Sequence, residues 1–286
     1  MVTLSDAYAA SRKALTQAGL ADADFDARVL VELVTGLDYY GAMGAPLSEE
    51  QENALISLTL KRAEHYPLQY LCGSWDFFDF TLNIGPGVLI PRGDTEIVCE
   101  QAIKAVKAAA TENFAPEVID LCSGSGAIAI ALARAVPVAA VTAVELSHEA
   151  QKYLRKNVAA LAPTIHIIEA DVFHWQTELA KNSVDVIVSN PPYLAPGEVA
   201  TLAPELCFEP KMAFEAPGDA LSFYRHIATA YRAALKPGGM LVFEIGSEQA
   251  QAVCDILAAA QYTDPTVTLD YAGLPRAVSA RRCVDC

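Results

Sequence analysis

The sequence predicts an α/β protein with a doubly wound sheet, preceded by a small helical bundle. Beyond residue 116, apolar runs of strand length alternate with stretches of helix length. This alternation is typical of a parallel sheet that is covered by helices on both faces. The first 65 residues contain helical patterns only. We therefore expect two domains within the 286 residues, one of about 190 residues and a smaller companion.

The N-terminal part is expected to contain at least three helices. Residues 4–19 and 22–36 are amphipathic, and each stretch ends on a glycine, a residue common just after a helix C-terminus. A further helix is expected from Ser48, because Ser48 and Gln51 can form a capping box, and it should end before Pro67. These helices would pack as a small bundle without a catalytic motif.

Residues 75–92 read "WDFFDFTLNIGPGVLIPR", and their residue pattern differs from that of both neighbouring parts. Alternating aromatic residues and a Gly-Pro-Gly turn predict a β-hairpin. We place the domain boundaries at 1–74 for the bundle, 75–92 for the hairpin linker and 93–286 for the larger domain. Asp94 is expected to cap the helix that follows the linker.

The larger domain contains the strand and helix patterns on which the fold prediction depends. Between the strands lie helical stretches such as "AIAIALARA" and "SHEAQKYLRKNVAAL". The apolar runs of strand length are residues 117–121, 138–146, 164–170, 183–189 and 239–246.

Composition and charge exclude several classes of protein. The longest purely apolar stretch is far shorter than the roughly 20 residues that a membrane helix needs, and the N-terminus lacks the apolar core of a signal peptide. We therefore expect a cytoplasmic protein. The seven cysteines are scattered and odd in number, which favours reduced thiols. Cys283 and Cys286 have redox spacing, but no second pair completes a zinc site, and a frayed terminus is the favoured interpretation.

The net charge of −15 bears on the choice of partner. Proteins that follow a phosphate backbone usually present a basic face, because their affinity comes largely from released counterions. Strong nucleic-acid binding is therefore disfavoured. A basic protein partner fits better.

Polar groups follow the first two predicted strands of the larger domain. The first strand leads into "DLCSGSGA", in which Asp120 precedes a loop of small residues and the start of a helix. Gly124 and Gly126 would let the backbone approach a ligand closely, and the helix N-terminus offers unpaired N–H groups. The second strand ends at Glu145, and an acid at this position usually accepts hydrogen bonds from a ribose diol. For these two features alone, a tight turn followed by a surface acid stays an alternative.

The third strand adds groups that suit an adenine ring. Asp171 is placed to meet the exocyclic amine, and Val172 or Phe173 to pack on the ring. The loop lacks both the G-x-G-x-x-G of dinucleotide-binding folds and the Lys-Ser/Thr pair of a phosphate-binding loop. S-Adenosylmethionine, which has no phosphate, therefore fits better than NAD or ATP.

The fourth strand ends in Asn190, Pro191, Pro192 and Tyr193. The side-chain oxygen of Asn190 and the carbonyl of Pro191 could accept the two N–H groups of an amide or aryl amine. This would orient the nitrogen lone pair at a methyl donor and stabilise the positive charge that develops. The prolines would stiffen the loop, and Tyr193 could stack on a planar guest. A plain Asn-Pro turn is the alternative for the tetrapeptide alone.

Over nearly its whole length the chain resembles the release factor glutamine methyltransferases, the PrmC/HemK family. The matching segments include "HYPLQYLCGSWDFFDFTLNIGPGVLIPRGDTEIV", "DLCSGSGAIAIALA", "VSNPPY", "FEP", "GDALSFYRHI" and "EIG", in the order of the family. The linker block and "FEP" are the specific ones, since adenine methyltransferases share the tetrapeptide.

The resemblance implies a Rossmann-like, seven-stranded methyltransferase domain, joined by a hairpin to an N-terminal bundle that recognises the release factor. It implies a monomeric enzyme that uses S-adenosyl-L-methionine to methylate N5 of the glutamine in the Gly-Gly-Gln motif of class I peptide chain release factors. Asn190 and Pro191 would hold this amide, and Tyr193 would shape its slot. The cofactor residues implied are Asp120, Cys122, Ser123, Gly124, Ser125, Gly126, Glu145, Asp171, Val172 and Asn190.

Four positions depart from the pattern of the family. Cys122 stands where the family usually has the first glycine of its loop, and Gly93 replaces a proline of the linker block. Glu145 replaces the commoner aspartate, and residues 274–278 match the ending of the family only loosely. These departures concern cofactor affinity more than the reaction.

Two other functions would use parts of the same pattern. A nucleic-acid adenine N6-methyltransferase would use the same tetrapeptide on a flipped base, but the net charge of −15 argues against it. A cofactor-binding adaptor without activity would not need an intact tetrapeptide and intact acids at the strand ends.

Overall fold

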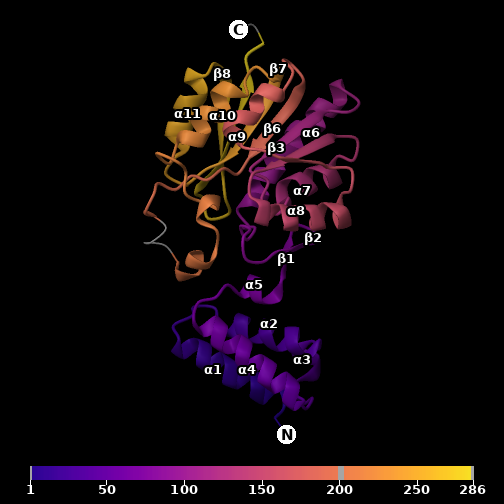
Figure 1. Ribbon diagram of the computed structural model, residues 1–286, viewed down its shortest axis with the longest axis vertical. Coiled ribbons are helices and arrows are strands. Elements are labelled where there is room, and N and C mark those ends of the chain that lie inside the picture. Colours follow the sequence, from indigo (N-terminus) through magenta and orange to yellow (C-terminus); the bar gives the residue numbers. More distant parts are fainter. Residues whose placement is uncertain (1, 199–202, 285–286) are drawn as a thin grey trace. The chain divides into compact units, whose positions relative to one another are not determined.

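The computed structural model describes residues 2–198 and 203–284, which form two compact units. Unit 1 comprises Met1–Ser74 together with Pro204–Phe208, and unit 2 comprises Trp75–Ala203 and Glu209–Cys286. Figure 1 shows the helices of unit 1 and the sheet with flanking helices of unit 2. Sequence patterns do not indicate that residues 204–208 group with the helices.

In its described residues unit 1 contains five α-helices, and the predicted ones are present. The Ser48 and Gln51 capping box is confirmed, since each side chain accepts a hydrogen bond from the backbone N–H of the other residue. Gly36 ends its helix in the left-handed region, with a φ of 69°. The helices are α1 (Leu4–Gln17), α2 (Ala23–Thr35), α3 (Tyr39–Ala42), α4 (Glu49–Ala63) and α5 (Leu68–Cys72).

A buried ion pair holds residues 204–208 in unit 1. Arg62 Nε lies 2.7 Å from Asp26 Oδ2, and both side chains are at most 10% exposed. The same guanidinium contacts Glu205 at 3.1 Å. The rings of Tyr66 and Phe208 pack edge to face with centroids 5.1 Å apart. One arginine thus joins α2, α4 and the 3₁₀ helix η3 (Pro204–Phe208).

Unit 2 is built on a seven-stranded sheet of order β5-β4-β3-β6-β7-β9-β8, which confirms the doubly wound α/β prediction. The five strands from β3 to β7 are parallel, as predicted for the five apolar runs, and β9, which those runs did not include, is antiparallel to both of its neighbours. The reason is the short link between β8 and β9, because only antiparallel strands can be joined by a tight turn. The strands are β3 (Glu117–Leu121), β4 (Ala140–Glu145), β5 (His166–Glu169), β6 (Val184–Ser189), β7 (Leu235–Glu244), β8 (Tyr262–Leu269) and β9 (Pro275–Arg282).

Helices cover both faces of this sheet. Figure 1 shows α6 (Thr95–Glu112), α7 (Ala127–Ala135) and α8 (His148–Leu161) on one side, and α10 (Ser222–Ala230) and α11 (Ala250–Ala259) on the other. The short α9 (Val172–Trp175) follows β5.

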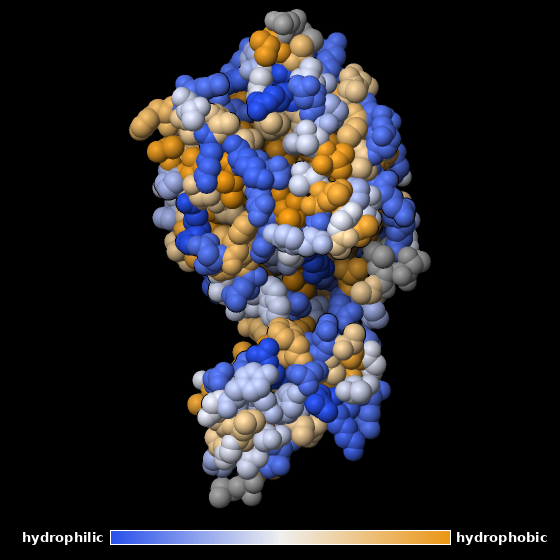
Figure 2. All heavy atoms as spheres, turned by 180° about the vertical axis from the view of Figure 1, so that it is seen from behind, coloured by the Kyte–Doolittle hydropathy of each residue, from blue (hydrophilic) through white to orange (hydrophobic). Residues whose placement is uncertain are grey.

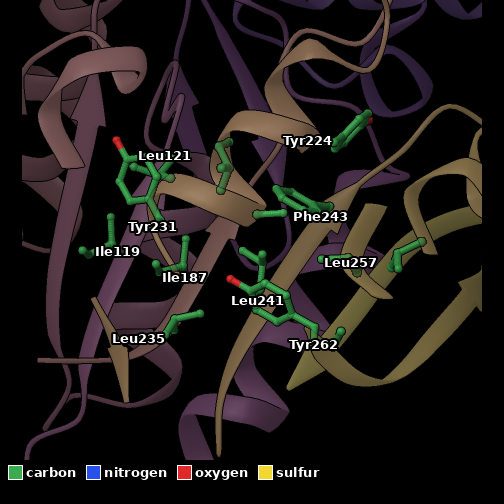
Figure 3. Close-up of a cluster of buried hydrophobic side chains, with 14 of the residues drawn as sticks. Ile119, Leu121, Ile187, Tyr224, Tyr231, Leu235, Leu241, Phe243, Leu257 and Tyr262 are labelled. Atoms are coloured by element: carbon green, nitrogen blue, oxygen red, sulfur yellow. The ribbon is translucent and has the colours of Figure 1, made fainter. Parts of the chain in front are cut away.

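The core on the α10 and α11 side is formed by alternate residues of the strands (Figure 3). Ile119, Ile187 and Leu241 are in register on three neighbouring strands and are at most 4% exposed. Tyr224 and Tyr231 close this layer, and each buried phenol donates to a backbone carbonyl, Glu244 O at 2.9 Å and Val172 O at 2.8 Å. Both carbonyls belong to residues at or next to a strand end, so the core fixes the edge where the site lies.

The linker differs from the prediction at two points. Strands β1 (Ser74–Phe77) and β2 (Phe80–Asn83) pair, but their turn is formed by residues 78 and 79, with Phe78 at a φ of 53°, and not by the Gly-Pro-Gly at 85–87. Asp94 precedes α6 but makes no side-chain cap; its carboxylate instead lies 3.1 Å from Arg276. A distant cation therefore outcompetes the local N–H groups.

The order of the strands determines where a ligand can bind. From β3 the chain first builds β4 and β5 on one side and then β6 and β7 on the other. In such sheets the crevice lies at the carboxyl ends of the two strands at the reversal. Here these strands are β3 and β6, which pair through Leu121 and Ser189 as the last residues in register.

Within the described residues, no helix is both long and apolar enough to cross a membrane. Figure 2 shows apolar side chains interspersed with polar ones on the face opposite to that of Figure 1.

Gly126 provides a test of the close packing at the start of α7. Its φ is 88°, and a Cβ there would lie 2.7 Å from Leu154 Cδ1. We expect Gly126→Ala to lower the free energy of unfolding by about 1–3 kcal/mol, because it combines a left-handed backbone with overpacking. Chemical denaturation measures this change. Gly93→Ala is the matched control, since a Cβ at Gly93 meets no atom within 4 Å and should cause no loss. Equal stability of the two variants would contradict the packing argument.

Candidate functional site

An open cleft of about 670 Å³ lies at the carboxyl edge of the sheet in unit 2. It brings together residues that follow four strands, and Ser123 and Ser125 line a smaller hollow beside it, which Cys122, Gly124 and Asn190 also border. Of the predicted site residues, the cleft is lined by Cys122, Gly124, Glu145, Asp171, Val172, Asn190 and Pro192.

The loop after β3 has an unusual backbone. Cys122, Gly124 and Gly126 all have positive φ angles, of 62°, 55° and 88°. Cys122 therefore adopts the left-handed conformation although it carries a side chain, at a cost of about 1–2 kcal/mol. Ser123 helps to hold it there, since its N–H donates to Val144 O at 3.0 Å and its hydroxyl to Asp120 O at 2.8 Å.

Glu145 ties this loop to the end of β4. Its carboxylate accepts hydrogen bonds from Gly124 N at 2.8 Å and from Ser147 N at 2.7 Å. Burial raises the pKa of Glu145, and these backbone N–H groups oppose the rise by stabilising the ionised form. Each oxygen keeps a further lone pair, so the carboxylate can still accept hydrogen bonds from a diol in the cleft.

Asp120 lies beneath the loop and is fully buried. One oxygen, Oδ2, accepts from Ala129 N at 3.2 Å, but Oδ1 has no partner in the described structure. Burial raises the pKa of Asp120 to about 7, and the hydrogen bond from Ala129 N opposes this rise only in part. An unpartnered carboxyl oxygen under a ligand loop is a site for a polar or cationic group.

The third strand end positions an acid beside apolar groups. The carboxylate of Asp171 accepts from Phe173 N at 2.9 Å and lies 3.0 Å from His174 Nδ1. Val172 is buried and lines the cleft. Among the described residues, Phe223 lines the cleft and Phe173 does not. Phe173 packs against Phe223, with the two ring centroids 4.8 Å apart. Sequence reasoning offered Phe173 and missed Phe223.

The tetrapeptide after β6 is split between the cleft and the core. Asn190 and the buried Pro192 line the cleft, and Asn190 Nδ2 lies 3.5 Å from Thr95 Oγ1. Pro191 is buried. Tyr193 packs against the core cluster; burial raises its pKa to about 12, and its carbonyl accepts from Gln249 at 2.8 Å. The phenol therefore stays protonated at neutral pH.

Comparison with known proteins identifies the family. Residues 6–73 match the model of the PrmC N-terminal domain, and residues 101–221 match that of the methyltransferase small domain. The release factor glutamine methyltransferase of Geobacter sulfurreducens is 34% identical over 95% of this chain and 94% of its own length. The chain belongs to the release factor glutamine methyltransferase family. The family member of Caulobacter vibrioides is 33% identical over 97% of this chain and 96% of its own. That of Fusobacterium nucleatum is 36% identical over 85% and 68%.

The cleft of this family member fits S-adenosylmethionine. That molecule carries a sulfonium and an ammonium, together with a ribose and an adenine. The described residues lining the cleft include the acids Glu145 and Asp171 but no lysine, arginine or histidine, which disfavours a phosphate-bearing cofactor. The two acids suit a cationic molecule with hydroxyl and amine groups, and Val172 with Phe223 suits a flat aromatic ring.

Glu209, in the "FEP" segment, is a site residue that sequence reasoning did not single out. It is 5% exposed, accepts from Ile90 N at 2.9 Å and forms an ion pair with Arg92. Val88 and Leu89, just before Ile90, line the cleft, as does Pro210. Glu209 therefore joins two chain segments that border the cleft. The joint presence of "IPR" and "FEP" was the available sequence indication.

Because the pKa of Asp120 is raised in the folded protein, we expect the free energy of unfolding to depend on pH. Well below pH 4 the carboxyl is protonated in both states; as pH rises through about 4 the unfolded chain ionises first, and the folded protein holds the proton until about pH 7. The free energy of unfolding of the wild type, relative to Asp120→Asn, should therefore fall between pH 4 and 7 by up to about 4 kcal/mol and then level off.

Chemical denaturation at a series of pH values measures this difference. Asp79→Asn, which changes an exposed ion pair with Arg134, is the control and should show little dependence on pH. A difference for Asp120→Asn that grows in the opposite direction would disprove the burial argument.

Proposed function

We propose that this protein methylates N5 of the glutamine side chain in the Gly-Gly-Gln motif of class I peptide chain release factors. Two facts support the proposal together: the chain belongs to the release factor glutamine methyltransferase family, and Asn190 stands at the edge of a cleft suited to a cationic nucleoside. The position of Asn190 is the observation that supports the reaction itself, because an asparagine oxygen beside a methyl donor can accept a hydrogen bond from an amide N–H.

The methyl donor is S-adenosyl-L-methionine, which supplies a methyl group on a positively charged sulfur and leaves as S-adenosyl-L-homocysteine. We assign the loop of Cys122, Ser123, Gly124, Ser125 and Gly126 to the methionine end. In addition, Asp120 would face its cationic groups, Glu145 would accept from the ribose hydroxyls, and Asp171 with Val172 would flank the adenine.

The residues of the tetrapeptide would supply orientation and charge stabilisation. The Asn190 side-chain oxygen and the Pro191 carbonyl accept the two N–H bonds of the glutamine amide, which turns the nitrogen lone pair toward the methyl group. The nitrogen–carbon bond forms as the sulfur–carbon bond breaks, and one N–H proton is then released. Both acceptors stabilise the positive charge on nitrogen during this step. Pro192 stiffens the loop, and Tyr193 shapes the slot.

The wider biological assignment follows from this substrate. We propose that unit 1 recognises the release factor, that the enzyme is monomeric and does not bind nucleic acid stably, and that it acts in the cytoplasm, where release factors work. The net charge of −15 supports a protein over a nucleic acid as partner. An adenine N6-methyltransferase is therefore not favoured.

The decisive experiment follows a labelled methyl group from S-adenosylmethionine to a purified class I release factor. We expect one methyl group on the wild-type factor and none on a factor whose Gly-Gly-Gln glutamine is replaced. Label that persists on the replaced factor would show that another residue is the substrate. Transfer to DNA or RNA instead would favour the adenine alternative.

Asn190→Ala tests the role of the amide acceptor. Removing an acceptor that acts in the transition state should lower kcat by several orders of magnitude, roughly 10²–10⁴-fold. Binding of S-adenosylmethionine, measured by calorimetry, should change little. Unchanged turnover would refute the mechanism, whereas loss of cofactor binding would place Asn190 mainly in the cofactor site.

A further inference from the structure

A buried carboxyl group with an unpartnered oxygen lies beside Asn190 and has no role in the mechanism above. Glu244 is the last residue of β7 and is 2% exposed. Its Oε2 has no hydrogen-bond partner in the described structure. Because Ser189 and Phe243 are in register, Asn190 and Glu244 follow them side by side on neighbouring strands. This carboxyl therefore belongs to the edge of the sheet where the amide is held.

Thr95 is a third polar residue at this edge of the sheet, beside Glu244 and Asn190. It is the first residue of α6 and is 4% exposed. Its hydroxyl oxygen lies 3.5 Å from Asn190 Nδ2, and Thr95 and Asn190 both favour the ionised form of Glu244 and so lower its pKa against the larger rise that burial causes. A hydroxyl both accepts and donates. Thr95 can therefore accept from Asn190 while it donates to Glu244.

We propose that Glu244 is a positioning residue for methyl transfer, which together with Thr95 holds the Nδ2 end of Asn190 toward the protein and so presents its Oδ1 to the substrate amide. This inference rests on the proposed function and adds a residue to it. The group is defined by three side chains that neighbouring elements bring together, Glu244 from β7, Asn190 from the end of β6 and Thr95 from α6.

The argument rests on the near-symmetry of an asparagine amide. Its oxygen and nitrogen ends have almost the same shape, so shape alone does not decide which end faces the cleft. An ionised carboxylate is only an acceptor and therefore attracts the Nδ2 end. A reversed Asn190 would point N–H donors at the N–H donors of the substrate. Glu244 thus selects the productive orientation through electrostatics.

The protonation state of Glu244 then controls the orientation. Burial raises its pKa to about 7, against the opposing effects of Thr95, Arg276 and Asn190, and Asp94 adds to the rise. Once protonated, the carboxyl can donate to Asn190 Oδ1 and stabilise the reversed amide. The orientation of Asn190 that presents Oδ1 to the substrate is therefore favoured above about pH 7 and is lost as the pH falls below it.

The tyrosines, the cysteine and the arginine near Glu244 stay protonated across neutral pH. Burial raises the pKa of Tyr193 to about 12 and those of Tyr224 and Cys99 well above their usual values. The pKa of Arg276, which pairs with Asp94 and Asp270, is raised by those carboxylates against the effect of burial.

The experiment compares kcat of the wild type with that of Glu244→Gln on the same release factor, at saturating substrates and from pH 6 to 8. At pH 8 we expect the variant to be about 10- to 100-fold slower, as is typical when a residue that orients an active group is lost. The wild-type to variant ratio should rise about tenfold between pH 6 and 8, as the ionised fraction of Glu244 rises. Titration of Asp120 affects both proteins and cancels in this ratio.

Two further measurements separate positioning from folding. Calorimetry should give the same affinity for S-adenosylmethionine in wild type and variant. Thr95→Val, which removes the hydroxyl at almost constant volume, should lower kcat, and Thr95→Ser should retain it. A ratio that is flat with pH, or a Glu244→Gln kcat within about twofold of wild type at pH 8, would overturn the inference. Wild type without turnover on the factor would instead refute the proposed function itself.

Discussion

The pairing of β3 with β6 is the constraint on which the site depends. It sets Leu121 beside Ser189, and the hydroxyl of Ser189 donates to Leu121 O at 2.7 Å. The next residues along these strands are Cys122 and Asn190, so the cofactor loop and the tetrapeptide begin side by side. A slip of one residue in this register would turn the side chains of β6 to the opposite face. The backbone hydrogen bonds between β3 and β6 therefore determine how Cys122 and Asn190 lie relative to each other.

Three buried carboxyl groups surround this edge, and they oppose the stability of the empty protein. Asp120, Glu145 and Glu244 all have raised pKa values, for which burial is the largest cause. Charged groups without full compensation are costly in a protein interior. A cationic ligand offsets this cost when it binds, because it supplies the missing opposite charge. Of the three, Glu145 lines the cleft, so it is the carboxylate whose burial a bound ligand can compensate directly.

Local patterns were sufficient to predict the regular elements of the fold, because these depend on periodicity and on caps. The Ser48 capping box and the strand at Glu117–Leu121 are examples. Features that depend on distant partners were missed. Asp94 turns to Arg276 instead of capping α6. In the site, the acids at strand ends could be found from spacing. Phe223 could not, since long-range packing places it at the cleft, and Glu209 was indicated only by the joint presence of "IPR" and "FEP".

The grouping of Pro204–Phe208 with unit 1 has a consequence for how this chain can be divided. The chain passes between the units after Ser74, after Ala203 and after Phe208. A chain cut at residue 75 would therefore not yield a self-contained catalytic half. It would keep Glu205 and Phe208 but lose Arg62 and Tyr66, their partners in the bundle. A single cut in the sequence therefore does not separate the two units.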